Sequence, residues 1–410
     1  MDRYAGTSVS ESVRRAEEAG REVFGSSWAP DGVAVAPGRI ELLGNHVDYN
    51  GGPVLAAAID RFIVVAVDRE AEPGHKVRAV AADAHGEKAA TLDADALADW
   101  RNASPPPTWP DYARGLLAGL RERPYLTPRL PSSIAIAGDV PIGFGVSSSA
   151  ALCVSLGLAL AAGFTKPEEL VLLAQEAEHR AGTPCGTMDQ SASVSGGVIA
   201  FDGATLAIER LSPALGNLVF VLADSGVERS LSTSSYPRRV SESRDALDRA
   251  RRHFAEEIPN LAALSAPRLD ELDRSGALPE PLARRARHIV EETARVHEGR
   301  AAMANGDWVS FGRLMTASGR SSATLYDISH PRVEELVAEA LTVEAVMGAR
   351  MMGGGEGGAV LILIPRHAVD DLEARLRSGY YRRYDMTDRS GLIHTCSIGP
   401  GAAYVSTVTA

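Results

Sequence analysis

The sequence has few cysteines and no long apolar run. Its 410 residues include only three cysteines, Cys153, Cys185 and Cys396. They are far apart and lack the paired spacing of a zinc site or a disulfide framework, so we expect a reducing compartment. The longest nearly apolar stretch, residues 150–164, contains serine and glycine and is shorter than the roughly 18 to 20 residues that span a bilayer. We interpret this stretch as a buried helix.

A basic stripe is also missing. The chain has 42 Lys and Arg against 53 Asp and Glu, a net charge of −11, with the two signs interleaved. The sequence therefore predicts no positively charged surface that would attract phosphate backbones or anionic membranes. Neither nucleic acid nor a membrane is expected as a partner. Acidic residues near the start of the chain interrupt the apolar run that a secretory signal needs. We predict a cytoplasmic protein, and no feature of the sequence points to a protein partner.

The composition that remains is that of a folded protein of two domains. With 45% hydrophobic and 23% charged residues, the chain resembles ordinary globular proteins. It is too long for a single core, since single cores rarely grow beyond roughly 250 to 300 residues. Turn-forming residues between 200 and 217 favour a boundary there, which gives domains 1–210 and 211–410.

Alternating β-rich and helical segments predict a mixed α and β fold. An amphipathic helix is predicted over residues 282–304, where Asn305 and Gly306 form a stop signal. Short β-rich runs lie at residues 33–35, 59–67, 134–137, 218–222 and 360–364.

A glycine- and serine-rich segment, residues 138–151, lies between a strand-like run and a helical run. Glycine allows backbone N–H groups to approach an anion, the helix dipole favours negative charge, and serine hydroxyls donate hydrogen bonds or bind Mg²⁺. The lysine of a Walker A motif does not follow. Taken alone, the segment fits a phosphate loop and a serine-capped turn about equally.

A second glycine cluster, residues 353–358, surrounds Glu356 and precedes a strand. Five glycines around one acid are entropically costly, so the backbone is expected to approach a ligand or another loop closely. A flexible β-turn is the alternative interpretation.

Polar residues also concentrate in residues 38–52, which we predict to form a loop between two strands. Such density of donors and acceptors suits a ligand rich in hydroxyls, because each buried polar group left unpaired costs roughly 1 to 3 kcal/mol. A solvated turn is the simpler interpretation.

Asp189 is the one acid in the glycine-bounded segment 182–190. A carboxylate there can orient and deprotonate an attacking hydroxyl, while a guanidinium such as that of Arg39 offsets developing charge. Seen alone, such an Asp is more often a helix cap.

Together and in this order, these segments resemble the three motifs of the GHMP kinase superfamily. Residues 38–52, GRIELLGNHVDYNGG, are similar to the galactokinase signature G-R-x-N-L-I-G-E-H-x-D-Y-N-G-G. Residues 109–112 (WPDY) and 236–239 (YPRR) resemble the family's W-x-x-Y and Y-N-x-R-R elements. The resemblance implies an α+β, two-domain GHMP kinase fold, with an N-terminal ribosomal-protein-like domain, a C-terminal ferredoxin-like domain and an active site between them. It also implies ATP and Mg²⁺ as cofactors and phosphorylation of the anomeric hydroxyl of galactose or a closely related sugar.

The resemblance assigns roles to individual residues. Asp189 matches the catalytic base and Arg39 the cation beside it, whereas Ser149 and Glu178 match the Mg²⁺ ligands, although Glu178 is one residue closer to the base than usual. Trp109 is expected on the adenine side. Contacts to the sugar are expected from Asn45, His46, Asp48, Gly186 and Tyr236, and contacts to the nucleotide phosphates from Gly143, Gly145, Ser147, Ser148 and Ser149.

Two departures from the family pattern bear on the substrate. Glu41 and Asn45 stand where the signature has Asn and Glu, and Glu356 stands where the third motif usually has Phe. An amide both donates and accepts, whereas a carboxylate only accepts, so Asn45 favours a related substrate such as L-arabinose, N-acetylgalactosamine or a uronate. A sensor that binds sugar and ATP without turnover is the other alternative, but Ser149 and Asp189 favour catalysis. The mevalonate and homoserine kinase branches lack the H-x-D-Y-N-G-G segment.

Overall fold

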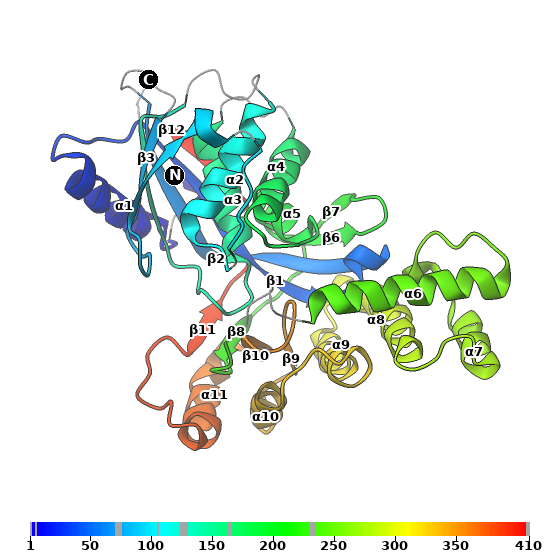
Figure 1. The fold of residues 1–410 in the computed structure, drawn as a ribbon. Helices are drawn as coiled ribbons and strands as arrows, with labels where there is room; N and C mark the ends of the chain where they lie inside the picture. The colour runs from blue at the N-terminus through cyan, green and yellow to red at the C-terminus, as the bar shows by residue number, and fades with distance from the viewer. Residues whose placement is uncertain are drawn as a thin grey trace.

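The computed structural model describes residues 2–4, 6–69, 76–97, 99–104, 106–123, 130–161, 166–228 and 235–406. It has two lobes, each organised around a sheet (Figure 1). The larger sheet is antiparallel except where β3 and β5 run parallel. Its strand order is β12 (Ala403–Ser406), β1 (Gly32–Leu43), β2 (Pro53–Asp68), β5 (Ser133–Gly138), β3 (Lys76–Ala81) and β4 (Ala89–Asp93), and β6 (Val198–Asp202) joins β2 to β7 (Ile208–Leu211).

Helices cover both faces of this sheet, because successive residues of its strands place apolar side chains on opposite faces. On β5, Ile134 and Ile136 pack under one helical layer, whereas Ala135 and Ala137 pack on the opposite side with Ala16 of α1 (Val9–Phe24). The layer over the isoleucines consists of α2 (Trp109–Arg121), α3 (Ser148–Leu160), α4 (Pro167–Arg180) and α5 (Met188–Ser195). The helices that carry the serine-rich segment and Asp189 thus lie on one face.

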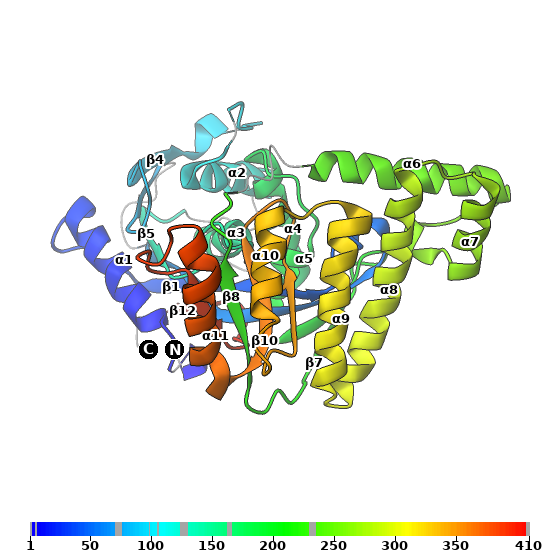
Figure 2. The same ribbon diagram turned by 90° about the horizontal axis from the view of Figure 1, so that it is seen from below.

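The second lobe is a four-stranded antiparallel sheet with helices across one face (Figure 2). Its strand order is β11 (Ile393–Cys396), β8 (Leu218–Asp224), β10 (Ala359–Pro365) and β9 (Gly348–Met351). The helices of this lobe are α6 (Tyr236–Phe254), α7 (Ala266–Ser275), α8 (Leu282–Ala304), α9 (Trp308–Ser321), α10 (Pro331–Ala340) and α11 (Val369–Leu376).

A shared apolar core joins the two lobes. Ile40 and Leu42 of β1 pack in one cluster with Phe220 of β8, Leu361 of β10 and Phe311 of α9. Side chains at this junction are therefore held from both lobes. Within the described residues, no helix is long and apolar enough to cross a membrane.

Several predicted elements are confirmed. The five β-rich runs lie in β1, β2, β5, β8 and β10, and the helix predicted over residues 282–304 is α8. The helix predicted over residues 150–164 is α3, although residues 162–164 lie outside the described residues. The boundary near residue 210 stays a prediction.

The predicted loop over residues 38–52 is wrong in its first part, because residues 38–43 complete β1 and the turn begins at Gly44. The reason is visible in the alternation of the segment. Ile40 and Leu42 enter the shared core, and a strand directs the residues between them to the opposite side. Arg39 and Glu41 consequently face away from that core and line a cavity.

Candidate active site

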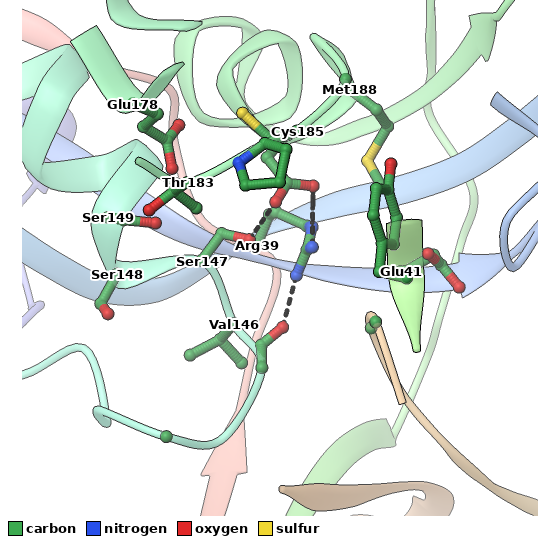
Figure 3. Close-up of a pocket in the computed structure, with 18 of the residues that line it drawn as sticks. Arg39, Glu41, Val146, Ser147, Ser148, Ser149, Glu178, Thr183, Cys185 and Met188 are labelled. Atoms are coloured by element: carbon green, nitrogen blue, oxygen red, sulfur yellow. Dashed lines mark hydrogen bonds and ion pairs between the residues drawn. The ribbon is translucent and has the colours of Figure 1, made fainter. Parts of the chain in front are cut away.

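A cavity of about 500 Å³ lies at the junction of the lobes, within the size range of small-molecule sites. Figure 3 shows Ser148, Ser149 and Glu178 on one side of it and Glu41 on the other, with Arg39 between them. The lining residues on which the site depends are Arg39, Glu41, His46, Asp48, Tyr112, Gly143, Gly145, Ser147, Ser148, Ser149, Glu178, Gly186, Asp189, Tyr236, Gly353 and Gly354.

The serine-rich segment forms the turn from β5 into α3. Gly143 and Gly145 have φ of 85° and 78°, the left-handed conformation that glycine adopts without strain. Ser147, the residue before α3, has φ of 56°, a conformation that costs a non-glycine residue of order 1 kcal/mol or more. The first N–H groups of a helix lack helical partners and carry its positive dipole end. The turn is therefore suited to binding an anion at the cavity wall.

Asp189 lies in the first turn of α5, and both of its carboxylate oxygens are engaged. Arg39 places Nε at 2.8 Å and Nη2 at 2.7 Å from Oδ1, while the hydroxyl of Ser147 donates to Oδ2. The cap of α5 is Thr187, so Asp189 is not the helix cap. Arg39 is itself fixed, since its Nη1 donates to the carbonyl of Gly145 at 2.6 Å. A carboxylate and a guanidinium are thus held beside this turn.

Glu178, in the last turn of α4, faces the same region. The side chain is 2% exposed, and burial is the main cause that raises its pKa to about 7. Ser149 and Gln190 donate hydrogen bonds to it. Within the described residues it forms no ion pair. A buried carboxylate without a cation in contact is suited to binding one.

A further part of the cavity wall is formed by His46, Asp48, Gly186 and Tyr236. Burial raises the pKa of Asp48 to about 7 and lowers that of His46 to about 3. His46 also has φ of 62° and lies 5.3 Å, between ring centroids, from Tyr236. A Cβ at Gly186 would lie 2.6 Å from Oδ2 of Asp48, so any larger residue would displace that carboxylate.

Two residues of α8 hold the turn that carries His46, and the sequence analysis assigned no role to either. Glu292 accepts the backbone N–H groups of Gly44 at 2.9 Å and Asn45 at 3.2 Å, and His288 hydrogen-bonds the carbonyl of Asn45 at 2.9 Å. Burial alone would raise the pKa of Glu292, but Arg295 and other neighbours lower it to about 2. A signal was present, because both ionisable residues fall on the buried side of an amphipathic helix.

The position predicted for Asn45 is not supported by the structure. Its side chain is fully buried and does not line the cavity. Nδ2 donates to Oε1 of Glu41 at 3.0 Å and to the carbonyl of Gly353 at 2.9 Å, while Oδ1 accepts from Ser322 at 2.9 Å. These bonds use both donors of the amide and occupy its oxygen. Of the two residues that are exchanged relative to the family signature, Glu41 lines the cavity, and the sequence analysis did not assign it to the site.

Trp109 is likewise outside the cavity lining. In the first turn of α2, its indole is half-buried against the apolar core of the larger lobe, and Nε1 donates to the carbonyl of Glu87 at 2.7 Å. Tyr112, one turn further along the same helix, lines the cavity instead. The W-x-x-Y motif thus reaches the site through its tyrosine.

The structure gives a physical account of Glu356, the second departure. Its Oε1 accepts the backbone N–H of Ser235 at 3.1 Å, at the N-terminus of α6. A carboxylate at that end satisfies a free N–H and interacts favourably with the helix dipole, which Phe cannot do. The glycine cluster is thereby connected to the helix that begins with Tyr236.

Comparisons with known protein families cover the same segments. The galactokinase galactose-binding signature matches residues 21–69, the GHMP kinases N terminal domain residues 111–197, and the GHMP kinases C terminal domain residues 300–382. A galactokinase from Roseiflexus sp. is 35% identical over 384 residues, 92% of this chain and 93% of the relative. A galactokinase from Homo sapiens is 32% identical over 388 residues, 91% and 93% of the two chains.

Solved structures confirm the predicted fold. The structure of Lactococcus lactis galactokinase complexed with galactose matches with a TM-score of 0.82 and 27% identity, covering 95% of this chain and 99% of that one. A mevalonate kinase with 16% identity matches with a TM-score of 0.62 over 90% of this chain and 99% of that one, and shares the fold alone. The two-domain GHMP kinase fold is therefore established for this chain.

Proposed function

The chain belongs to the galactokinase family of GHMP kinases, and from this premise we propose that it transfers the γ-phosphoryl group of ATP to the anomeric hydroxyl of galactose. Family membership makes it an ATP-dependent sugar kinase. The observation that carries the proposed site is that Asp189, held by Arg39 at 2.7 Å, and the helix N-terminus beginning at Ser148 line the same cavity.

Asp189 is proposed to act on the attacking hydroxyl. The anomeric oxygen forms a bond to the γ-phosphorus as the bond from that phosphorus to the β,γ-bridging oxygen breaks. Asp189 takes up the proton of the hydroxyl, and the electron pair of the broken bond leaves on ADP. Since phosphoryl transfer depends mainly on positioning and charge stabilisation, Arg39 serves both purposes by orienting the carboxylate and offsetting charge on the transferred group.

The phosphates are assigned to the turn of Gly143, Gly145 and Ser147–Ser149. Figure 3 shows the side chains of Ser148 and Ser149 on the side of the cavity where Glu178 lies. Glu178 and Ser149 fit Mg²⁺, because the buried carboxylate has no contacting cation within the described residues and a hydroxyl oxygen is adjacent. When bound with the nucleotide, Mg²⁺ supplies charge neutralisation of the phosphate oxygens. Carboxylate and hydroxyl oxygens are the ligand types that this hard cation prefers.

The sugar is assigned to the part of the wall that His46, Asp48 and Tyr236 form. His46, neutral because of its lowered pKa, hydrogen-bonds through Nδ1 to the Tyr49 hydroxyl at 2.9 Å, and its buried Nε2 makes no hydrogen bond of normal geometry within the described residues. Asp48 and Tyr236 add two further polar groups to the wall. Several fixed polar groups around a small cavity allow discrimination between hydroxyl arrangements, because a wrong isomer leaves some of them unpaired.

The proposal is tested with a panel of free sugars and Mg·ATP, followed by locating the phosphate on the product by NMR. Galactose is expected to give the highest kcat/KM and a product phosphorylated at C1. A preference for L-arabinose, N-acetylgalactosamine or a uronate would replace the named substrate and retain the reaction. Binding of sugar and ATP without any sugar phosphate would overturn catalysis in favour of a sensor.

A further inference from the structure

The exchanged residues Glu41 and Asn45 are in direct contact. Nδ2 of Asn45 donates to Oε1 of Glu41 at 3.0 Å, from the turn to the last residues of β1. Relative to the galactokinase signature, the exchange therefore moves a carboxylate from one member of a hydrogen-bonded pair to the other. The site keeps one acid and one amide, but the acid now stands on the strand.

Only one member of this pair is available to a ligand. Both N–H donors of the Asn45 amide are used by Glu41 and Gly353, and the side chain is 0% exposed and outside the cavity lining. Glu41 lines the cavity, and both hydrogen bonds that it accepts within the described residues go to Oε1. Its second oxygen, Oε2, is left with unused acceptor capacity.

A buried cation fixes the direction of the carboxylate. Nη2 of Arg350, on β9 of the other lobe, lies 2.6 Å from Oε1 of Glu41, and the arginine side chain is 0% exposed. Nη1 and Nε of the same guanidinium donate to the carbonyls of Leu42 at 3.2 Å and Met351 at 2.9 Å, so Arg350 is held rigidly. Fixing one oxygen through Arg350 and Asn45 fixes the position of the other.

We infer that Glu41 determines sugar specificity in this enzyme, by accepting a hydrogen bond at Oε2 from a sugar hydroxyl other than the reacting one. Figure 3 places Glu41 across Arg39 from Ser149 and Glu178, so the hydroxyl that it contacts lies away from the phosphates. Asn45 and Arg350 are positioning residues that act through Glu41. The inference rests on the proposed sugar kinase function. It assigns recognition of the sugar hydroxyl to Glu41 instead of Asn45.

The inference is tested by asking whether replacing the Glu41 carboxylate changes the effect of removing a single hydroxyl from the sugar. Wild type and Glu41→Gln are compared with galactose and with its 2-, 3-, 4- and 6-deoxy derivatives, measuring kcat/KM for each. With wild type, one deoxy sugar is expected to lose about 10- to 100-fold, the size of a hydrogen bond to a charged group. With Glu41→Gln, the penalty for that same sugar is expected to shrink to a few-fold, while the other deoxy sugars keep their relative rates.

Ser322→Ala is the matched control. It removes the donor to Oδ1 of Asn45 and leaves both contacts of Glu41 in place, so the wild-type pattern of deoxy penalties should persist. An identical pattern in wild type and Glu41→Gln would overturn the inference. Galactose turnover by wild type reports separately on the proposed function, so the two failures are distinguishable.

Glu41→Asp provides a second test of the inference. It is needed because Glu41→Gln removes a negative charge beside the buried Arg350, which destabilises the fold. Aspartate keeps the charge and withdraws it by one methylene. The selective deoxy penalty is expected to fall several-fold with folding intact, as judged by circular dichroism and nucleotide binding. A Glu41→Asp enzyme with the wild-type pattern would contradict the assignment.

Discussion

Replacing Glu178 with Gln is expected to stabilise the ligand-free protein while impairing catalysis. The carboxyl group is 2% exposed, and its burial raises the pKa to about 7. Ionising such a group in the folded chain is unfavourable, because burial penalises the charged form. Glutamine has nearly the same shape and stays neutral, so it removes that penalty.

The pKa shift sets the magnitude and the pH range. A carboxyl whose folded pKa is raised contributes stability that is fully present below its unfolded pKa and is lost as pH rises through the folded value. From an ordinary value of 4.5 to about 7, the loss amounts to about 3 kcal/mol at pH 8. At pH 5 most of the group is still protonated, and the difference falls below about 1 kcal/mol.

Urea unfolding of wild type and Glu178→Gln at pH 5 and pH 8, without ligands, measures this difference. The free energy of unfolding of the variant should exceed that of wild type at pH 8 and approach it at pH 5. Turnover should be strongly reduced at both pH values. Glu168→Gln, at an exposed position in the first turn of the same helix, is the control and should show no pH-dependent gain. A Glu178→Gln protein less stable than wild type at pH 8 would refute the argument from burial.

Three further substitutions probe the turn and the sugar end. Glu292→Gln should lower the free energy of unfolding in urea by about 3 kcal/mol near pH 7, because a carboxyl group whose pKa is lowered by folding stabilises the protein above its unfolded pKa. This loss should shrink as the pH falls from 4 toward the folded pKa of about 2. Gly186→Ala places a Cβ 2.6 Å from Asp48 Oδ2 and should raise the sugar KM by about tenfold or more in steady-state assays, with the ATP KM nearly unchanged. Glu356→Gln weakens the charge at the N-terminus of α6 and should raise the sugar KM about 2- to 5-fold, and an unchanged KM would exclude a positioning role.

The part of the site that the sequence predicts is encoded in short contiguous segments. The turn of Gly143, Gly145 and Ser147 joins a strand to a helix, and both elements are evident from local apolar runs. Asp189 and Arg39 are 150 positions apart, and their pairing follows from family resemblance rather than from spacing. Local patterns thus predict which groups are present, whereas the resemblance predicts which of them meet.

The side chains that the sequence did not place depend on long-range packing. Asn45 and Glu41 both lie in one polar segment, and only the continuation of β1 to Leu43 decides that the acid lines the cavity and the amide does not. The residues that fix this arrangement, Arg350 and Glu292, come from the other lobe. A single sequence does not indicate which strand or helix will approach the turn, so these contacts emerge only from the fold.

The most direct test of the account is single turnover by Asp189→Asn with saturating galactose and Mg·ATP. Asparagine keeps the shape beside Arg39 and Ser147 but does not accept the hydroxyl proton. The rate of sugar 1-phosphate formation is predicted to fall by about 10²- to 10⁴-fold, with affinities for galactose and nucleotide changed only a few-fold. A variant that forms sugar 1-phosphate at the wild-type rate would contradict the account.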